Sequence, residues 1–195
     1  MPRTKEAFQQ IRDESRQHIL DIAAEVFAGK GLAHTKISDL AEAAGVSQGL
    51  LYRYFIDKDD LFIALLETPV SGAIQWTQDA IEYIGSPLEK LRRLTRQFLQ
   101  GMSEKPVYFQ ILTQAMALSG RVFETLAKLE TVVKMLRDLI TEGQKVGEIA
   151  KRNPDQLVFL YLSCLYGLAA GKSLNIDWID EHFPAAEAVL QVLKP

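Results

Sequence analysis

The segment VSQGLLYRYF, residues 46–55, collects hydrogen-bond donors of different kinds around a single glycine. Hydroxyl, amide and guanidinium groups are the side-chain donors that bind phosphate oxygens and the edges of bases. Gly49 has no side chain, so a helix that begins here can bring its N-terminus close to a phosphate, where free amides and the helix dipole favour an anion. The segment is therefore a candidate surface for a phosphate backbone.

Other residues that could do chemistry do not form a recognisable site. His18, His34 and His182 lack the spacing of metal ligands, and the chain has no nucleophile elbow, phosphate loop or His/Cys pair. The adjacent acids Asp59 and Asp60 fall at a predicted helix start, where capping explains them. We therefore expect no catalytic residue, no metal and no cofactor.

The elements that must position residues 46–55 are helices. Apolar residues recur with the helical period along almost the whole chain, and no convincing run alternates with period two, so the protein should be all-α. One helix is predicted from Ser15 to about Lys30. A second runs from about Lys36 to Ala44, with Thr35 as its cap and Gly45 just past its end.

The next helix is short and is braced from one side. Ser47 can cap it, and Val46 and Leu51 have the spacing of a hydrophobic staple. Leu51 and Phe55 point toward the core, because they are four residues apart on one helical face. Gln48, Tyr52 and Arg53 are left on the other sides. Two helices joined by a four-residue link, after a third packing helix, have the dimensions of a helix-turn-helix unit.

The remainder of the chain predicts a larger helical part. Asp57 caps a helix that opens at Lys58 and continues through Leu66, and residues 70–85 form a less clearly patterned helix. Cap and proline signals predict further helices at Leu88–Ser103, Pro106–Leu118, Arg121–Val146, Pro154–Leu174 and Pro184–Leu193. We assign residues 1–60 to a domain that contains the helix-turn-helix unit and residues 61–195 to a second, larger helical domain.

Residues 35–61, TKISDLAEAAGVSQGLLYRYFIDKDDL, resemble the N-terminal DNA-binding region of TetR-family transcriptional regulators. The family pattern is T-x-hydrophobic-x-acidic-I/L-A-x-x-A-G-V-S-x-G-x-L-Y-x-y/h-F-x-x-K-x-x-L, and this chain matches nearly every specified position. The resemblance extends over about Ser15 to Leu66. Beyond that range it rests on length and helical character.

The resemblance implies distinct roles for the residues of this motif. It implies phosphate contacts by Thr35, Ser47, Gly49, Tyr52, Tyr54 and Lys58. Gln48 and Arg53 are our candidates for base-edge contacts, because glutamine pairs with adenine and arginine with guanine in the major groove. Leu50 stands where many relatives carry a small polar residue, and it either touches a thymine methyl or packs. The alternatives are a core-edge position for Tyr52 and a solvated surface position for Lys58.

A helix-turn-helix unit reads one half-site, so two units spaced by about one duplex turn are needed. The resemblance places the dimer interface on the last two long helices, which we match to Pro154–Leu174 and Pro184–Leu193. Gly167 and Gly171 would permit close helix approach in the first of these. The alternative for that helix is an internal core position.

The middle of the chain is rich in large adaptable side chains that suit an apolar pocket. The resemblance implies that this region binds a small effector and that binding shifts the helix after Lys58. The candidate lining residues are Phe98, Met102, Phe109, Met116, Phe123 and Met135. An ordinary helical core is the alternative for each of them.

Charge and compartment add constraints. The net charge is −3, and residues 1–60 carry eight Lys and Arg against ten Asp and Glu, so DNA binding must rely on locally arranged donors. Arg3, Lys5, Arg12 and Arg16 are either a basic arm or a solvated tail. The single Cys164, the absence of a secretory segment and an uncharged stretch too short to span a membrane lead us to expect a cytoplasmic protein.

Together these features predict a homodimeric DNA-binding transcriptional regulator on a palindromic operator of double-stranded DNA. We expect a repressor released by a small, largely apolar effector, with activation as the alternative mode of control. The alternative function is a helical small-molecule-binding protein that keeps the fold without binding an operator. Salt-dependent duplex binding separates the two, because only the regulator should show it.

Overall fold

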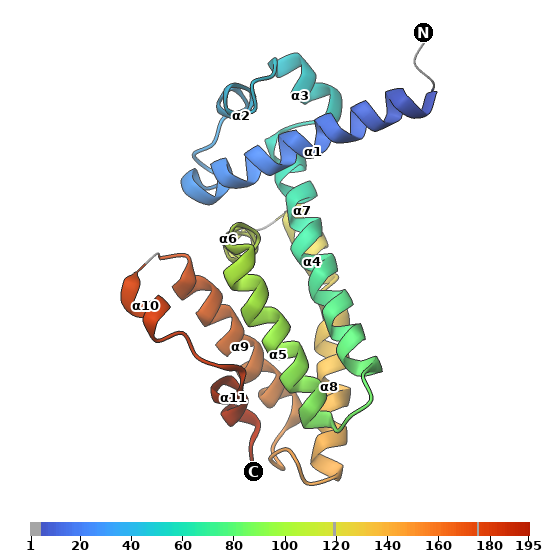
Figure 1. Cartoon of the computed structure of the whole chain (residues 1–195), viewed down its shortest axis with the longest axis vertical. Helices are drawn as coiled ribbons and strands as arrows, with labels where there is room; N and C mark the ends of the chain where they lie inside the picture. The colour runs from blue at the N-terminus through green and yellow to red at the C-terminus, as the bar shows by residue number, and fades with distance from the viewer. Residues whose placement is uncertain (1–4, 119, 175) are drawn as a thin grey trace. The chain divides into compact units, whose positions relative to one another are not determined.

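The computed structural model describes residues 5–118, 120–174 and 176–195, and every regular element within them is helical (Figure 1). The all-α prediction is confirmed. The helices are α1 (Lys5–Lys30), α2 (Ile37–Ala43), α3 (Gln48–Tyr54), α4 (Lys58–Glu82), α5 (Pro87–Glu104), α6 (Pro106–Ala115), α7 (Arg121–Ala127), α8 (Glu130–Lys145), α9 (Pro154–Lys172), α10 (Asp177–Glu181), α11 (Ala186–Val189) and a 3₁₀ helix at Leu190–Leu193.

The chain divides into two compact units, Met1–Glu67 and Thr68–Pro195. The division falls inside α4, so one continuous helix supplies residues to both units. The sequence pattern places the domain boundary after residue 60, and the change of unit in the structure comes after Glu67.

The first unit packs α1, α2, α3 and the start of α4 around one core. The rings of Phe27 and Phe62 meet edge to face, with centroids 5.3 Å apart, an arrangement that adds about 1 kcal/mol beyond the area buried. Its other buried side chains include Ile19, Ala23, Leu40, Leu51 and Leu61. These are the apolar residues that recur with the helical period, so the core of this unit could be predicted from that period.

Two boundaries in this unit differ from expectation. Helix α1 begins ten residues before the predicted Ser15, because side-chain pairs four residues apart, such as Gln9 with Asp13 at 2.9 Å, support an exposed segment that has no apolar stripe. Thr35 is not the cap of α2. Lys36 holds the cap position, and its amide donates to Asp39 Oδ2 at 3.4 Å.

The second unit packs α5, α8 and α9 together, with α6 against α5 and α9, with α11 also against α5 and α9, and with the 3₁₀ helix against α9 (Figure 1). The predicted starts of α5 and α9 are confirmed. Ser86 Oγ accepts from the Glu89 amide while Glu89 Oε2 accepts from the Ser86 amide, and Asn153 Oδ1 accepts from the Asp155 amide at 2.9 Å. These side chains bind amides that have no partner inside the helix.

Three predicted segments have a different extent in the structure. Pro69 lies within α4, although proline lacks the amide that donates inside a helix. The helix continues because Leu66 and Val70, on either side of Pro69, are both buried. The predicted helix Arg121–Val146 is broken at Lys128 and Leu129. The amides of these two residues donate to the carbonyl oxygens three residues earlier, and not four as in an α-helix. The predicted Pro184–Leu193 helix is shortened to α11 and the 3₁₀ helix.

Candidate functional site

Helix α3 is a two-turn rod fixed at both ends. Ser47 accepts a hydrogen bond from the Leu50 amide at 3.2 Å, which confirms it as the cap. Leu51 and Phe55 are 0% and 3% exposed, so they anchor the rod in the core of the first unit. The link before it is equally constrained, because Gly45 has a left-handed φ of 65° and the Val46 amide donates to Ala41 O at 2.9 Å.

The opposite side of α3 faces solvent. Tyr52 is 55% exposed, and Gln48, Gly49 and Arg53 are also exposed, whereas Leu50 and Tyr54 are half-buried. None of these donors is buried by the rest of its unit. The structure therefore brings the predicted base-contacting pair, Gln48 and Arg53, onto one short helix with Tyr52.

The fold itself does not require a glycine at position 49. Its φ is not in the left-handed region, and an added Cβ would meet only Ser47 Oγ, at 3.9 Å. The absence of a side chain at this exposed position leaves room for a close approach to the start of α3.

Two residues that we predict to contact phosphate, Thr35 and Lys58, have hydrogen-bond partners within the chain. Thr35 is 1% exposed, and its hydroxyl donates to Gly31 O at 2.7 Å while its amide donates to Leu32 O, so it has no donor left for a phosphate. The Lys58 ammonium donates to Leu32 O at 2.8 Å and to Thr35 O at 3.0 Å. Lys58 therefore holds the loop after α1, and at most its third proton can face outward.

Residues outside the motif also position α3. His18 Nε2 lies 3.1 Å from Ala44 O, which joins α1 to the link before α3, and the Arg16 guanidinium lies 5.2 Å from the Phe55 ring centroid. The sequence offered Arg16 only as part of a basic arm, and nothing in the pattern indicated His18. Their roles depend on how the helices pack, which spacing along the chain does not show.

Local electrostatics reduce repulsion of an anion near α2. A hydrogen bond from the Lys30 ammonium, 3.3 Å from Asp39 Oδ2, lowers the pKa of that carboxyl below its ordinary value. Asp39 is thus ionised and paired. The predicted cap Asp57 is confirmed, since its Oδ1 accepts from the Asp60 amide at 2.7 Å.

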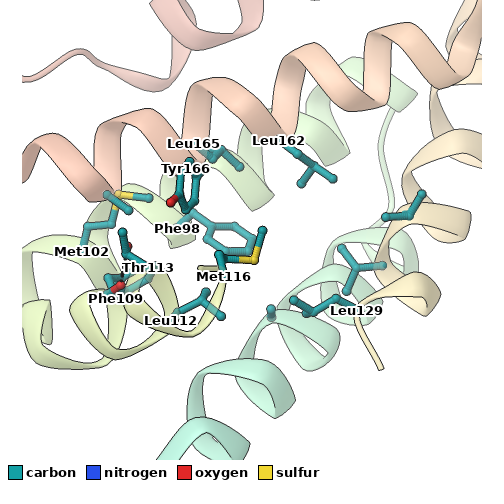
Figure 2. A pocket seen from close by; sticks show the side chains of 14 residues that line it. Phe98, Met102, Phe109, Leu112, Thr113, Met116, Leu129, Leu162, Leu165 and Tyr166 are labelled. Atoms are coloured by element: carbon teal, nitrogen blue, oxygen red, sulfur yellow. Dashed lines mark hydrogen bonds between the residues drawn. The ribbon is translucent and has the colours of Figure 1, made fainter. Parts of the chain in front are cut away.

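The second unit encloses an apolar cavity of about 150 Å³ between α5, α6, α8 and α9 (Figure 2). Its lining residues are Ala73, Phe98, Met102, Phe109, Leu112, Thr113, Met116, Leu129, Val132, Val133, Leu162, Leu165, Tyr166 and Ala169. The ring of Phe98 meets those of Trp76 and Phe109 edge to face, with centroids 5.4 and 6.4 Å apart. Only Thr113 and Tyr166 bring side-chain oxygen to the wall.

Four of the six predicted pocket residues, Phe98, Met102, Phe109 and Met116, line this cavity. Phe123 does not, because it is 65% exposed on α7, and Met135 packs half-buried against the core instead. Tyr166 and the α9 leucines were missed as lining residues, since α9 was read only as an interface or core helix. Some apolar residues of α9 line the cavity and others are exposed, because they lie on different faces of the helix.

The outer face of α9 is apolar and uncovered. Phe159 and Leu160 are 72% and 45% exposed, and they continue one helical face with Ser163 and Gly167. The inner face of the same helix buries Leu157, Tyr161 and Leu165. The core interpretation is therefore correct for one side of α9, and the other side is free to meet a second chain.

Two further observations concern the described residues alone. They contain no group of three His, Cys, Asp or Glu that could hold a metal ion. None of their helices combines the length and apolar character that crossing a membrane would require.

Comparison with known proteins identifies both parts of the chain. Residues 19–65 match the model of bacterial regulatory proteins, tetR family, and residues 85–170 match that of the tetracyclin repressor-like C-terminal domain. AcrR of Shigella flexneri is 37% identical over 94 residues, 47% of this chain and 43% of that protein, so the match spans less than half of AcrR.

Two relatives match over greater lengths. KstR2 of Mycobacterium tuberculosis is 26% identical over 154 residues, 75% of each chain, and its structure superposes with a TM-score of 0.75 over 92% of this chain and 95% of that one, at 20% identity. FadR of Bacillus subtilis, solved in complex with stearoyl-CoA, superposes with a TM-score of 0.72 over 90% of this chain and 94% of that one, at 20% identity. At this level of identity the superpositions show a shared fold.

Proposed function

The chain belongs to the tetR family of bacterial regulatory proteins, and we propose that it is a homodimeric repressor released from its operator by a small, largely apolar effector. The observation that carries the proposal is the solvent-facing end of α3, where exposed donors surround a glycine that the fold does not need. Among the relatives, AcrR is a named transcriptional regulator and KstR2 a named repressor, which supports regulation and not catalysis.

Phosphate and base contacts are divided between the residues of α3. We assign the Ser47 and Tyr52 hydroxyls, the Gly49 backbone and Tyr54 to phosphates, where they hold register without reading sequence. Gln48 and Arg53 are assigned to base edges in the major groove. Lys58 and Thr35 support this surface from behind, since they join α4 to the loop after α1.

The outer face of α9 is the proposed dimer interface. A second copy of the chain is its occupant, because an operator with two half-sites needs two copies of α3 related by a two-fold axis. Gly167 lies on this face, and a Cβ there would meet no atom of its own chain within 4 Å. Its small size lets two copies of α9 approach closely, with Phe159 and Leu160 covered by the partner chain.

The cavity of the second unit is the proposed effector site. Its wall suits an uncharged apolar body, and Tyr166 can meet one polar group, whereas the Thr113 hydroxyl already donates to Phe109 O at 2.7 Å. About 150 Å³ is below the range of roughly 300–1,000 Å³ typical of drug-sized ligands, so a long acyl chain such as that of stearoyl-CoA would require Met102 and Met116 to move. The effector must bind the DNA-incompetent arrangement more tightly, and DNA must therefore weaken effector binding.

The compartment and the competing function follow from this assignment. A regulator of bacterial genes works where the chromosome lies, so we propose the cytoplasm. The competing function is a helical small-molecule carrier that has lost operator binding. It predicts that no duplex binds even at low ionic strength.

Selection of bound duplexes from a random DNA pool tests the proposal. We expect the enriched duplex to be roughly palindromic and to bind two chains, with an affinity that falls steeply as the salt concentration increases. A compound screen on that complex then identifies effectors, and a reporter gene behind the selected site separates repression from activation. Failure to enrich any sequence would favour the carrier, and a non-palindromic winner bound by one chain would contradict the dimer.

A further inference from the structure

A second concave site lies on the outer face of α5, beside the end of α4, within the unit Thr68–Pro195. We call it the arginine groove. Its volume is about 540 Å³, and it is lined by Tyr83, Glu89, Arg92, Arg93, Arg96, Gln97 and Gln100. It shares no residue with the apolar cavity, because Phe98 and Met102 lie on the opposite face of α5.

Two guanidinium groups of the groove converge on a single carboxylate oxygen. Arg96 Nη2 lies 2.6 Å and Arg92 Nε 3.6 Å from Glu187 Oε1, which comes from α11 near the end of the chain. Hydrogen bonds from its own backbone amide and from Arg96 hold the pKa of Glu187 below its ordinary value. Arg92 and Arg96 therefore already bind one oxyanion of the chain itself, although Glu187 is not one of the residues that line the groove.

The third guanidinium is held without a carboxylate partner among the described residues. Arg93 lies 5.3 Å from the Tyr83 ring centroid, a cation–π contact that leaves its donors free. The Tyr83 ring is fixed against Gly85, where an added Cβ would come within 2.8 Å of Tyr83 Cε1. Beside it, Gln97 Oε1 is buried with no partner in the described part of the chain.

The charge balance favours a further anion. Three guanidinium groups face two carboxylates, and the Glu89 carboxylate is engaged by the Ser86 amide at 2.8 Å. Guanidinium groups bind phosphate through paired hydrogen bonds that an ammonium group does not match. A single phosphate would occupy a small part of the groove. A diphosphate spans several guanidinium groups, and once Arg93 moves from the Tyr83 ring onto the phosphate, that ring is uncovered for a flat base.

We propose that the arginine groove binds a nucleoside polyphosphate, with Arg92, Arg93 and Arg96 on the phosphate oxygens and Glu187 displaced from Arg96 by the ligand. When no ligand is bound, the Glu187 carboxylate competes for the guanidinium groups of Arg92 and Arg96. Binding therefore breaks this ion pair between α11 and α5, while the buried side chains of Ala186 and Val189 keep α11 packed in the unit.

Titration calorimetry of the full chain tests the proposal, with ADP, ATP, pyrophosphate and adenosine as probes at physiological salt. We expect one ADP or ATP per chain, weaker binding of pyrophosphate and none of adenosine. Arg96→Gln should weaken ADP binding by about tenfold or more, as expected for loss of a charge-assisted pair. Glu187→Gln should strengthen it, because the competing carboxylate is gone. Arg152→Gln, the same charge change at an exposed site outside the groove, should leave it unchanged.

Two outcomes would overturn the proposal. One is the absence of saturable nucleotide binding by a chain whose circular dichroism shows it folded. The other is that Arg96→Gln and Glu187→Gln behave like Arg152→Gln, as a solvated surface of charges would. In the first case, binding to phosphatidylglycerol vesicles would identify a lipid headgroup as the ligand in place of a nucleotide. Duplex affinity, measured in parallel, shows whether operator binding survives independently of this result.

Discussion

The ammonium of Lys58, at the first residue of α4, donates a hydrogen bond to Leu32 O at 2.8 Å, 26 residues earlier in the chain. A second bond to Thr35 O at 3.0 Å ties the same group to the residue just before the cap of α2. Both carbonyls lie in the loop after α1, and Leu32 O also accepts a longer hydrogen bond from the Thr35 amide, at 3.4 Å. Lys58 therefore fixes the loop that leads into the helix-turn-helix unit.

Replacing Lys58 with methionine should destabilise the first unit by about 2 kcal/mol, because two carbonyls lose a charged donor in a half-buried site. Hydrogen exchange of the α2 and α3 amides measures this locally. Lys36→Met is the matched control, since that side chain is exposed, and it should leave exchange unchanged. Equal exchange in the two variants would show that the Lys58 bonds contribute nothing.

Tyr52→Phe removes one exposed hydroxyl and keeps the ring on α3. If that hydroxyl binds a phosphate, the variant should bind every duplex more weakly by a similar factor. Arg53→Ala should instead change which DNA sequence is enriched in the selection, because a good bidentate contact discriminates against the wrong base by about 1–3 kcal/mol. Fluorescence anisotropy against a panel of single-base variants of the selected site measures both. The same ranking of sites for the two variants would refute the division of roles.

Much of the first unit could be predicted from sequence because its signals are local. The Ser47 cap, the left-handed Gly45 and the inward Leu51 and Phe55 each depend on residues a few positions apart, and all are confirmed. Thr35 could not be placed in this way. A threonine hydroxyl at this position can donate either to an outside ligand or to a carbonyl of the chain. It donates to Gly31 O because of the path of the loop, which the local sequence does not show.

The second unit shows a related limit. Apolar periodicity correctly marks Phe98 and Phe109 as inward residues, but a cavity is the space left between helices and depends on their separation. Phe123 has the same residue type and is exposed, because the break after α7 separates it from the pattern of α8. Tyr166 carries no sequence signal for the cavity beyond its place on α9.

The cavity itself is open to a direct test with a small apolar probe. An apolar cavity of about this volume can bind benzene, so we expect saturable benzene binding by nuclear magnetic resonance. Ala169→Leu adds carbon atoms to the wall and should abolish that binding while duplex affinity is kept. Ala188→Leu, an exposed position on α11, serves as the control. Benzene binding to Ala169→Leu that equals the unmodified chain would place the probe elsewhere.

A buried hydroxyl pair predicts a pH dependence of stability. Tyr161 OH lies 2.9 Å from Thr95 Oγ1, and burial raises the pKa of Tyr161 well above its ordinary value. The folded chain therefore keeps this proton at a pH where the unfolded chain has lost it. The contribution is complete below about pH 10 and is lost above it, by about 1.4 kcal/mol per pH unit.

Urea unfolding at several alkaline pH values isolates this contribution when Tyr161→Phe is compared with the unmodified chain. The unmodified chain should lose more of its unfolding free energy than the variant between about pH 10 and 11. Thr95 keeps Leu91 O as an acceptor at 2.7 Å in the variant, so its hydroxyl is not left unpaired. Parallel pH curves for the two chains would contradict the assignment.

The most direct test of the account is the duplex affinity of Gly49→Leu, measured with its unfolding free energy at low ionic strength. The side chain would extend into open space, since a Cβ at position 49 meets only Ser47 Oγ at 3.9 Å. We predict that stability is unchanged or higher, and that affinity for the selected operator falls by about a hundredfold, about 2.7 kcal/mol, because the bulk holds α3 away from the phosphates. Equal operator binding by the variant, or no duplex binding by the unmodified chain, would contradict the claim that this end of α3 enters DNA.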